Sequence, residues 1–126
     1  MRTLSIVIPA YNEEQFIGSL LERILAIPTE AAGFTKEILV VDDGSRDRTA
    51  AIASTFAGVK VFTQVPNQGK GRAVRRGIAE STGDYILIQD ADLEYDPSDY
   101  PALLAALSTA DSVYGSRTLG QARHQG

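Results

Sequence analysis

The alternation of short apolar runs with segments of helical spacing is the feature that most constrains this chain. The strand-like runs occupy residues 4–8, 37–41, 59–62 and 85–88. Strands that alternate with helices predict right-handed crossovers and a parallel sheet, and continuously apolar strands predict helices on both faces. The sequence therefore predicts an α/β fold with a mostly parallel central sheet, extended by a helix near 101–107 and a fifth strand near 112–114.

Local signals give the expected limits of the first elements. Pro9 is expected to end the first strand. Asn12 is expected to cap the following helix, where Glu13 and Glu14 favour the positive end of the helix dipole. Pro28 is expected to stop that helix.

Length and composition exclude several classes of protein. The 126 residues suit one domain, and a hydrophobic content of 44% is enough for a core. The absence of Cys excludes disulfides and thiolate metal sites. A formal net charge of −4 disfavours nucleic acid as a partner. No apolar run approaches the roughly 20 residues of a membrane span, and the N-terminus lacks a signal-peptide pattern, so we expect a cytoplasmic protein.

Polar and acidic residues follow the predicted strands. The segment 9–13 follows the first strand, Asp42 and Asp43 follow the second, and Asp90 and Asp92 follow the fourth. Ligands of open parallel sheets bind beyond the carboxyl ends of the strands. We therefore expect these side chains to converge on one edge of the sheet.

The Asp90-Ala91-Asp92 segment is the strongest chemical signal. Carboxylates two residues apart in an extended loop can point at one hard cation, and Mg²⁺ or Mn²⁺ prefers such oxygen ligands while leaving positions for substrate phosphates. Glu94 continues the alternation and is a candidate third ligand, directly or through water. The alternative is an acidic turn that caps the next helix, and for an isolated motif this short the alternative is favoured; the position after an apolar strand shifts the balance toward metal.

The Asp42-Asp43-Gly44-Ser45 segment admits two interpretations. A carboxylate at a strand end can accept hydrogen bonds from a nucleobase or ribose. The same residues can instead form a tight turn and a helix cap. Tyr11 can stack on a base or pack at the strand end.

The segment from Asn67 to Ala73 is rich in Gly and basic residues and precedes a helix. It matches neither GxxxxGK[ST] nor GxGxxG, which disfavours a P-loop or a Rossmann cofactor site. Lys70, Arg72 and the helix start favour an anion, whereas a surface turn into a basic helix explains them equally well. No nucleophilic triad can be assembled, because Cys is absent and the one His, His124, lies in a polar tail.

Five motifs together resemble family 2 glycosyltransferases. In family order they are Pro9-Ala10-Tyr11-Asn12-Glu13, Val40-Val41-Asp42-Asp43-Gly44-Ser45, Asn67-x-Gly69-Lys70-Gly71-x-Ala73, Asp90-Ala91-Asp92-Leu93 and Gly115-Ser116-Arg117. The similarity spans residues 4–117 and is greatest to dolichyl- and polyprenyl-phosphate sugar transferases. It implies a GT-A fold, Rossmann-like and binding a nucleotide sugar.

The resemblance also implies roles for individual residues. The nucleoside of a GDP- or UDP-sugar would contact Pro9, Tyr11, Glu13, Val40 and Asp42. Donor and metal would be held by Asp90, Ala91 and Asp92, with Glu94 as a third ligand of Mg²⁺ or Mn²⁺. Arg117 would contact the diphosphate or the sugar, and Lys70 is a weaker donor-side candidate. Asp92 and Arg117 are therefore the predicted catalytic residues.

The implied reaction is an inverting displacement that releases a nucleoside diphosphate. A polyprenyl or dolichyl phosphate acceptor is already ionised and needs no strong general base, whereas a sugar hydroxyl would need one. A lipid acceptor would place the protein at the cytoplasmic face of a membrane. A sugar-phosphate nucleotidyltransferase would want a Gly- and Arg-rich loop where Tyr11 to Glu14 stand, and a non-catalytic nucleotide-binding domain is a further alternative.

The catalytic domains of this family are longer than this chain. We therefore expect residues 1–126 to form the N-terminal, donor-binding part of a GT-A domain, with a flexible tail from about 118 to 126. Acceptor-side elements would be missing, so we expect nucleotide binding with poor sugar transfer. An exposed sheet edge would favour self-association as a homo-oligomer.

Overall fold

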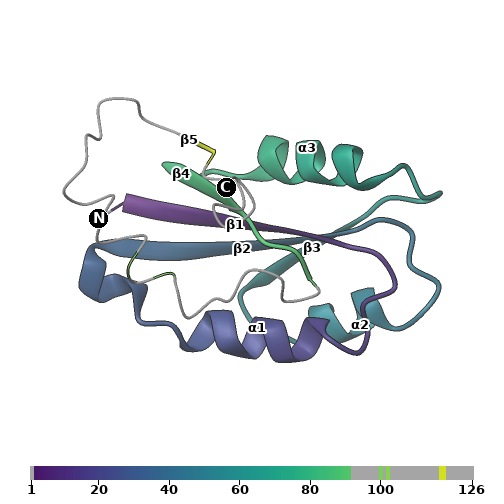
Figure 1. The fold of residues 1–126 in the computed structure, drawn as a ribbon, viewed down its shortest axis with the longest axis horizontal. Coiled ribbons are helices and arrows are strands. Elements are labelled where there is room, and N and C mark those ends of the chain that lie inside the picture. The colour runs from purple at the N-terminus through teal and green to yellow at the C-terminus, as the bar shows by residue number, and fades with distance from the viewer. Residues whose placement is uncertain (1, 92–99, 101, 103–116, 119–126) are drawn as a thin grey trace.

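The sheet of the computed structural model is parallel throughout the described part of the chain, which comprises residues 2–91, 100, 102, 117 and 118. Its strands are β1 (Arg2–Ala10), β2 (Phe34–Asp42), β3 (Val59–Thr63), β4 (Tyr85–Ile88) and β5 (Arg117–Thr118). They lie in the order β3-β2-β1-β4-β5 (Figure 1). The prediction of an α/β fold around a parallel sheet is confirmed.

Helices cover both faces of this sheet, as predicted. They are α1 (Ile17–Ala26), the 3-10 turn η1 (Thr29–Ala32), α2 (Thr49–Ser54) and α3 (Lys70–Glu80). Figure 1 shows α1 and α2 on one face and α3 on the other. No helix within these described ranges is long and apolar enough to cross a membrane.

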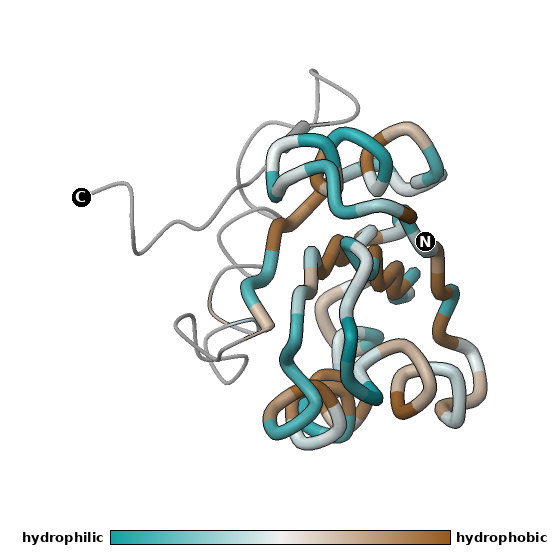
Figure 2. The backbone as a smooth tube through the Cα atoms, turned by 90° about the vertical axis from the view of Figure 1, so that its right-hand side faces the viewer, coloured by the Kyte–Doolittle hydropathy of each residue, from teal (hydrophilic) through white to brown (hydrophobic). Residues whose placement is uncertain are grey.

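The core is divided between the two faces of the sheet. The larger cluster packs β1, β2 and β4 side chains, such as Ile6, Val40 and Leu87, against α1 and α2. The smaller cluster contains Val7 and Leu39 and packs against α3. Hydrophobic residues accordingly occupy the middle of the molecule when it is turned by 90° (Figure 2).

Helix α3 lies unusually close to the sheet at Gly77. A Cβ added to Gly77 would collide with the side chain of Val7 on β1. This contact fixes how closely α3 approaches the central strand, and thereby where the first turn of α3 meets the carboxyl ends of the strands.

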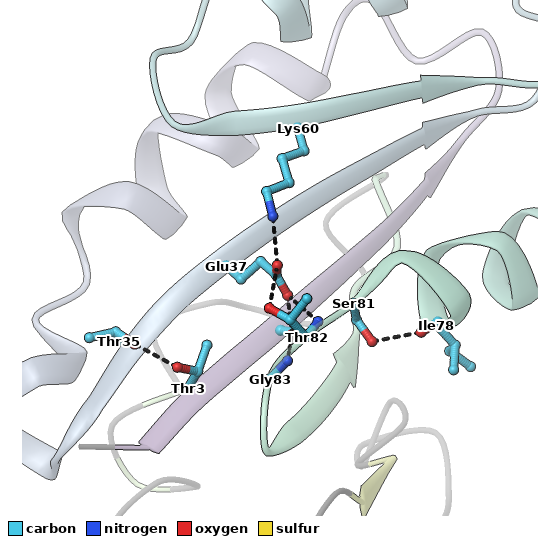
Figure 3. A network of polar contacts seen from close by, with 9 residues as sticks. Thr3, Thr35, Glu37, Lys60, Ile78, Ser81, Thr82 and Gly83 are labelled. Atoms are coloured by element: carbon cyan, nitrogen blue, oxygen red, sulfur yellow. Dashed lines mark hydrogen bonds and ion pairs between the residues drawn. The ribbon is translucent and has the colours of Figure 1, made fainter.

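A polar network secures the link between α3 and β4 (Figure 3). The Glu37 carboxylate of β2 accepts hydrogen bonds from Ser5, from the Lys60 ammonium at 2.7 Å, and from the amide and hydroxyl of Thr82, both at 2.8 Å. Burial opposes the ionisation of Glu37, but these hydrogen bonds outweigh burial and lower the pKa of Glu37 to about 2.

Two expected boundaries are wrong. Strand β1 continues through Pro9 to Ala10, because Pro9 fits the register opposite Val41 and the Ala10 carbonyl still accepts from the Asp43 amide at 2.8 Å. Helix α1 begins at Ile17 rather than after Asn12, because Asn12 has a left-handed φ of 53°.

Two further expectations fall largely outside the described residues. The strand expected near 112–114 is among them, and of the helix expected near 101–107 only Ala102 is described. The described strand beside β4 is β5, at Arg117–Thr118.

Candidate donor-binding site

Two adjacent cavities lie where the parallel strands end, at the right of Figure 1. The first measures about 410 Å³ and is lined by Pro9, Ala10, Tyr11, Glu13, Asp43, Asn67, Gly69, Lys70, Ala73, Asp90 and Ala91. The second measures about 370 Å³ and is lined by Tyr11, Asp42, Gly44, Ser45, Arg46, Thr63, Val65, Pro66 and Asn67. Tyr11 and Asn67 line both, so the two cavities share a wall. The predicted convergence is thus observed for Pro9, Ala10, Tyr11, Glu13, Asp42, Asp43 and Asp90, whereas Asn12 lines neither cavity.

An ion pair lies inside the first cavity. The Lys70 ammonium, at the start of α3, is 2.6 Å from Oδ1 of Asp90, which follows β4. The Asp90 side chain is only 11% exposed, whereas that of Lys70 is 60% exposed. The cavity therefore contains a fixed carboxylate whose partner cation comes from a largely solvated side chain.

Asp43 organises the loop that brings Lys70 into place. Its carboxylate accepts hydrogen bonds from the amides of Gln68 at 2.8 Å and Gly69 at 2.9 Å, and from the Gln64 side chain at 3.1 Å. The side-chain amide of Asn67 donates to the backbone carbonyl of Asp43 at 3.0 Å. The oxygens of Asp43 are thus engaged in holding the start of α3.

Asp42, its neighbour, has a different environment. Its Oδ2 accepts from the Ser45 amide at 3.2 Å, while its Oδ1 is buried without a hydrogen-bond partner. Gly44 permits the turn, since it has a φ of 74° and an added Cβ would lie 2.9 Å from the backbone nitrogen of Asn67. Asp42 thus lines the second cavity, while its Oδ1 is buried and unpaired.

The loops after β1 and β2 are tied together by reciprocal hydrogen bonds. The Asn12 amide donates to the Ser45 hydroxyl at 2.8 Å, and the Arg46 amide donates to the Asn12 side chain at 2.9 Å. The Glu13 amide donates to the Thr49 hydroxyl at 2.8 Å. These bonds hold the backbone on either side of Tyr11, which lines both cavities, and position Glu13, which lines the first.

The segment that begins with Asp90 is anchored at its base. Gln89 is fully buried, and its Oε1 accepts from the hydroxyl of the equally buried Tyr100 at 2.7 Å. The Gln89 side-chain amide donates to the Asp90 carbonyl at 3.2 Å. Gln89 thereby joins the end of β4 to a residue that lies beyond the acidic segment.

Four other predicted site residues are either described away from these cavities or lie outside the described residues. The Val40 side chain is 0% exposed in the core and lines neither cavity. The Arg117 backbone pairs opposite Tyr85, at the amino end of β4, so the described register does not place it at the carboxyl edge. Asp92 and Glu94 lie outside the described residues. Their predicted roles stay predictions.

Among the residues that the structure describes, no group of three or more His, Asp or Glu side chains forms a metal site. Mg²⁺ in proteins is commonly bound by one or two carboxylates together with substrate phosphates. Asp90 fits such a role, because its cavity-facing carboxylate already pairs with a cation.

Sequence reasoning missed Gln89 and Tyr100, and it did not foresee that Asp43 anchors the start of α3. A side-chain bond between residues 11 apart leaves no periodic signal. The Asn67-x-Gly69-Lys70 motif did mark the loop that Asp43 holds, but it did not reveal its partner.

Comparison with known proteins identifies the fold and the family of this chain. The fold is that of GT-A glycosyltransferases, whose solved structures include the glucosyl-3-phosphoglycerate synthase of Mycobacterium tuberculosis with Mn²⁺ and UDP-glucose. That structure has a TM-score of 0.69 and 34% sequence identity, and the match covers 87% of this chain and 40% of that one. The sequence model of glycosyl transferase family 2 matches residues 5–123. The chain belongs to glycosyl transferase family 2.

Curated relatives extend the comparison to named activities. The glucosyl-3-phosphoglycerate synthase of Mycolicibacterium smegmatis is 41% identical, over 90% of this chain and 39% of that protein. The dolichyl-phosphate β-glucosyltransferase of Drosophila melanogaster is 40% identical, over 82% of this chain and 35% of that protein. The chain thus spans less than half the length of these relatives.

Proposed function

We propose that this chain forms the donor-binding part of a metal-dependent glycosyltransferase that takes a nucleotide-diphosphate sugar and transfers the sugar with inversion. The observation that carries the proposal is the Asp90 carboxylate paired with Lys70 in a cavity at the carboxyl edge of the sheet. A UDP-sugar is the favoured donor over a GDP-sugar, because a similar solved structure holds UDP-glucose and Mn²⁺.

Each cavity suits one part of such a donor. The second cavity is lined by Tyr11 and Asp42, whose aromatic ring and carboxylate suit a base that stacks and donates an N–H group. The first cavity presents Lys70 and Asp90, which suit a diphosphate and its cation. The shared wall formed by Tyr11 and Asn67 would then lie along the ribose.

The residues of the first cavity address the main barrier of the reaction. As the bond between the anomeric carbon and the diphosphate oxygen breaks, negative charge develops on the leaving group. A bound Mg²⁺ or Mn²⁺ would neutralise part of this charge as a Lewis acid. Lys70 would contribute a second positive charge, and Asp90 would hold the cation beside the diphosphate. Asp92 and Arg117 are proposed to assist, and Glu94 is proposed as a further metal ligand.

The proposed acceptor is a polyprenyl or dolichyl phosphate, which supplies an ionised oxygen and requires no general base from this chain. Relatives named as dolichyl-phosphate and undecaprenyl-phosphate sugar transferases support it. Such an acceptor would bring the protein to the cytoplasmic face of a membrane. A second candidate, 3-phosphoglycerate, is favoured by the 41% identical synthase. Incubation of the full-length protein with radiolabelled UDP-glucose and either acceptor, followed by product separation, distinguishes the two.

Titration calorimetry with UDP, with and without Mn²⁺, tests the proposed site. We expect Mn²⁺ to strengthen UDP binding. In Asp90→Asn we expect this Mn²⁺-dependent gain in UDP affinity to be smaller by about tenfold or more, since neutralising a carboxylate ligand removes a charge-assisted metal contact. Asp84→Asn is the matched control, because Asp84 lies before the amino end of β4 and accepts from the Thr3 amide. Equal UDP affinity with and without Mn²⁺ in the unchanged chain would overturn the proposal.

A further inference from the structure

We propose that the Lys70 ammonium is a resident counter-cation of Asp90, which the divalent cation displaces and which then moves to the donor's diphosphate. The inference rests on the proposed function, because it assumes that Asp90 is a metal ligand. It adds that Lys70 couples binding of the divalent cation to binding of the nucleotide. Each of these two ligands should bind more weakly alone than in the presence of the other.

The two partners differ in their freedom to move. The Asp90 side chain is nearly buried, and the Gln89 amide group also bonds its carbonyl at 3.2 Å. The Lys70 side chain is mostly solvated. Its backbone is held at the start of α3, because Asp43 binds the two preceding amides. Lys70 is therefore anchored at its base with a mobile head, and it is the partner that can leave.

The ion pair with Lys70 compensates the negative charge of Asp90, which would otherwise be buried at a high free-energy cost. A nearly buried carboxylate without a partner is strongly disfavoured, so a cation must accompany Asp90 before any metal arrives. Asp43 does not need Lys70 as a partner, since both Asp43 carboxylate oxygens already accept hydrogen bonds. The Lys70 head therefore pairs with Asp90.

A divalent cation at Asp90 would compete for the oxygen that Lys70 occupies. Two positive charges on one carboxylate repel each other, so a metal on Asp90 weakens the 2.6 Å pair and favours release of the ammonium. Without a nucleotide the displaced ammonium gains only water. With a diphosphate in the same cavity it gains an anionic partner, and the cost is offset. Metal and nucleotide should therefore bind with positive coupling, and this coupling must be reciprocal.

The test measures binding of MnCl₂ alone, of UDP alone and of each in the presence of the other, by titration calorimetry. Lys70→Met keeps the aliphatic stem and removes the charge. We expect Lys70→Met to bind Mn²⁺ alone more tightly than the unchanged chain does, by about fivefold or more, and the coupling factor to fall to the part that direct attraction between Mn²⁺ and the diphosphate supplies. Lys70→Arg should restore the coupling, because it restores the charge. Arg75→Met, one turn further along α3 on an exposed residue that lines neither cavity, should behave as the unchanged chain.

The outcomes separate the inference from the proposed function. If the unchanged chain binds Mn²⁺ through Asp90 but Lys70→Met binds it with equal or lower affinity, Lys70 is not the resident counter-cation. If the unchanged chain and Asp90→Asn bind Mn²⁺ alike, the proposed metal site itself is wrong, and the inference falls with it. Circular dichroism of each variant, with Lys70→Gln as a second uncharged substitution, guards against a folding defect.

Discussion

Two adjacent carboxylates show how much of this site is decided residue by residue. Both carboxylate oxygens of Asp43 accept hydrogen bonds from backbone amides of the loop before α3, while Asp42 has one buried oxygen without a hydrogen-bond partner. Leaving a buried acceptor unsatisfied costs about 1–3 kcal/mol. Such a cost is tolerated where a ligand supplies the missing donor, and this supports the proposal that Asp42 recognises the base.

We therefore predict that Asp42→Asn weakens uridine binding by about 1–3 kcal/mol. The asparagine oxygen can still accept from the Ser45 amide, but its NH₂ group then faces a base N–H where an acceptor is needed. Calorimetry with uridine and, separately, with pyrophosphate plus Mn²⁺ measures the effect, because pyrophosphate lacks the base. Unchanged uridine affinity, or an equal loss for both ligands, would place the base elsewhere.

At the scale of elements, the start of α3 depends on one side chain from β2's end. No side chain caps α3 locally, and its cap residue Gly69 has a φ of 99°. The two amides bound by Asp43 are the tie between this helix and the strand ends. The close approach at Gly77 holds the other half of the helix.

Asp43→Ala is accordingly expected to lower the free energy of unfolding by about 2–4 kcal/mol, since it removes hydrogen bonds to a charged acceptor and leaves the part-buried amides of Gln68 and Gly69 and the buried Gln64 side chain without this partner. Urea unfolding followed by circular dichroism measures the loss. Asp84→Ala, which removes a single exposed hydrogen bond from the Thr3 amide, is the control and should cost about 1 kcal/mol or less. A similar cost for both variants would show that α3 is anchored mainly by its packing.

At the scale of the whole molecule, the Glu37 network joins three strands to the α3–β4 link (Figure 3). The pKa of Glu37 is lowered to about 2 in the folded chain from an ordinary value of 4.5. A lowered folded-state pKa contributes stability that is fully present above pH 4.5. That contribution is lost as the pH falls toward 2.

We predict that the unfolding free energy of the chain falls between pH 4.5 and 2, and that Glu37→Gln shows a shallower fall and a lower stability at pH 7. Urea titrations across this pH range provide the measurement. Parallel slopes for the two proteins would mean that other carboxylates account for the acid sensitivity. Self-association, the 1–126 domain boundary and the tail from 118 to 126 stay predictions at this scale.

The sequence was sufficient for what depends on hydrophobic patterning. It predicted β4 at residues 85–88 without error and β3 within one residue, because both are compact runs bounded by turn residues. It also placed Asp42, Asp43 and Asp90 at one edge, since parallel strands end on the same side.

What escaped prediction depends on contacts between distant residues. The left-handed Asn12 is stabilised by partners in another loop, 33 and 34 residues away. The placement of Val40 in the core rather than at a cavity follows from which face of β2 it occupies. The division of labour between Asp42 and Asp43 is set by the loop before α3. None of these leaves a local pattern in the chain.

The reciprocal bonds between the loops after β1 and β2 have an entropic consequence. Loops that must become ordered on binding subtract that ordering from the affinity. Here Asn12, Glu13, Ser45 and Thr49 already restrain one another, so the conformational cost was met when the chain folded. The nucleoside proposed to bind beside these loops would therefore order little additional backbone on binding.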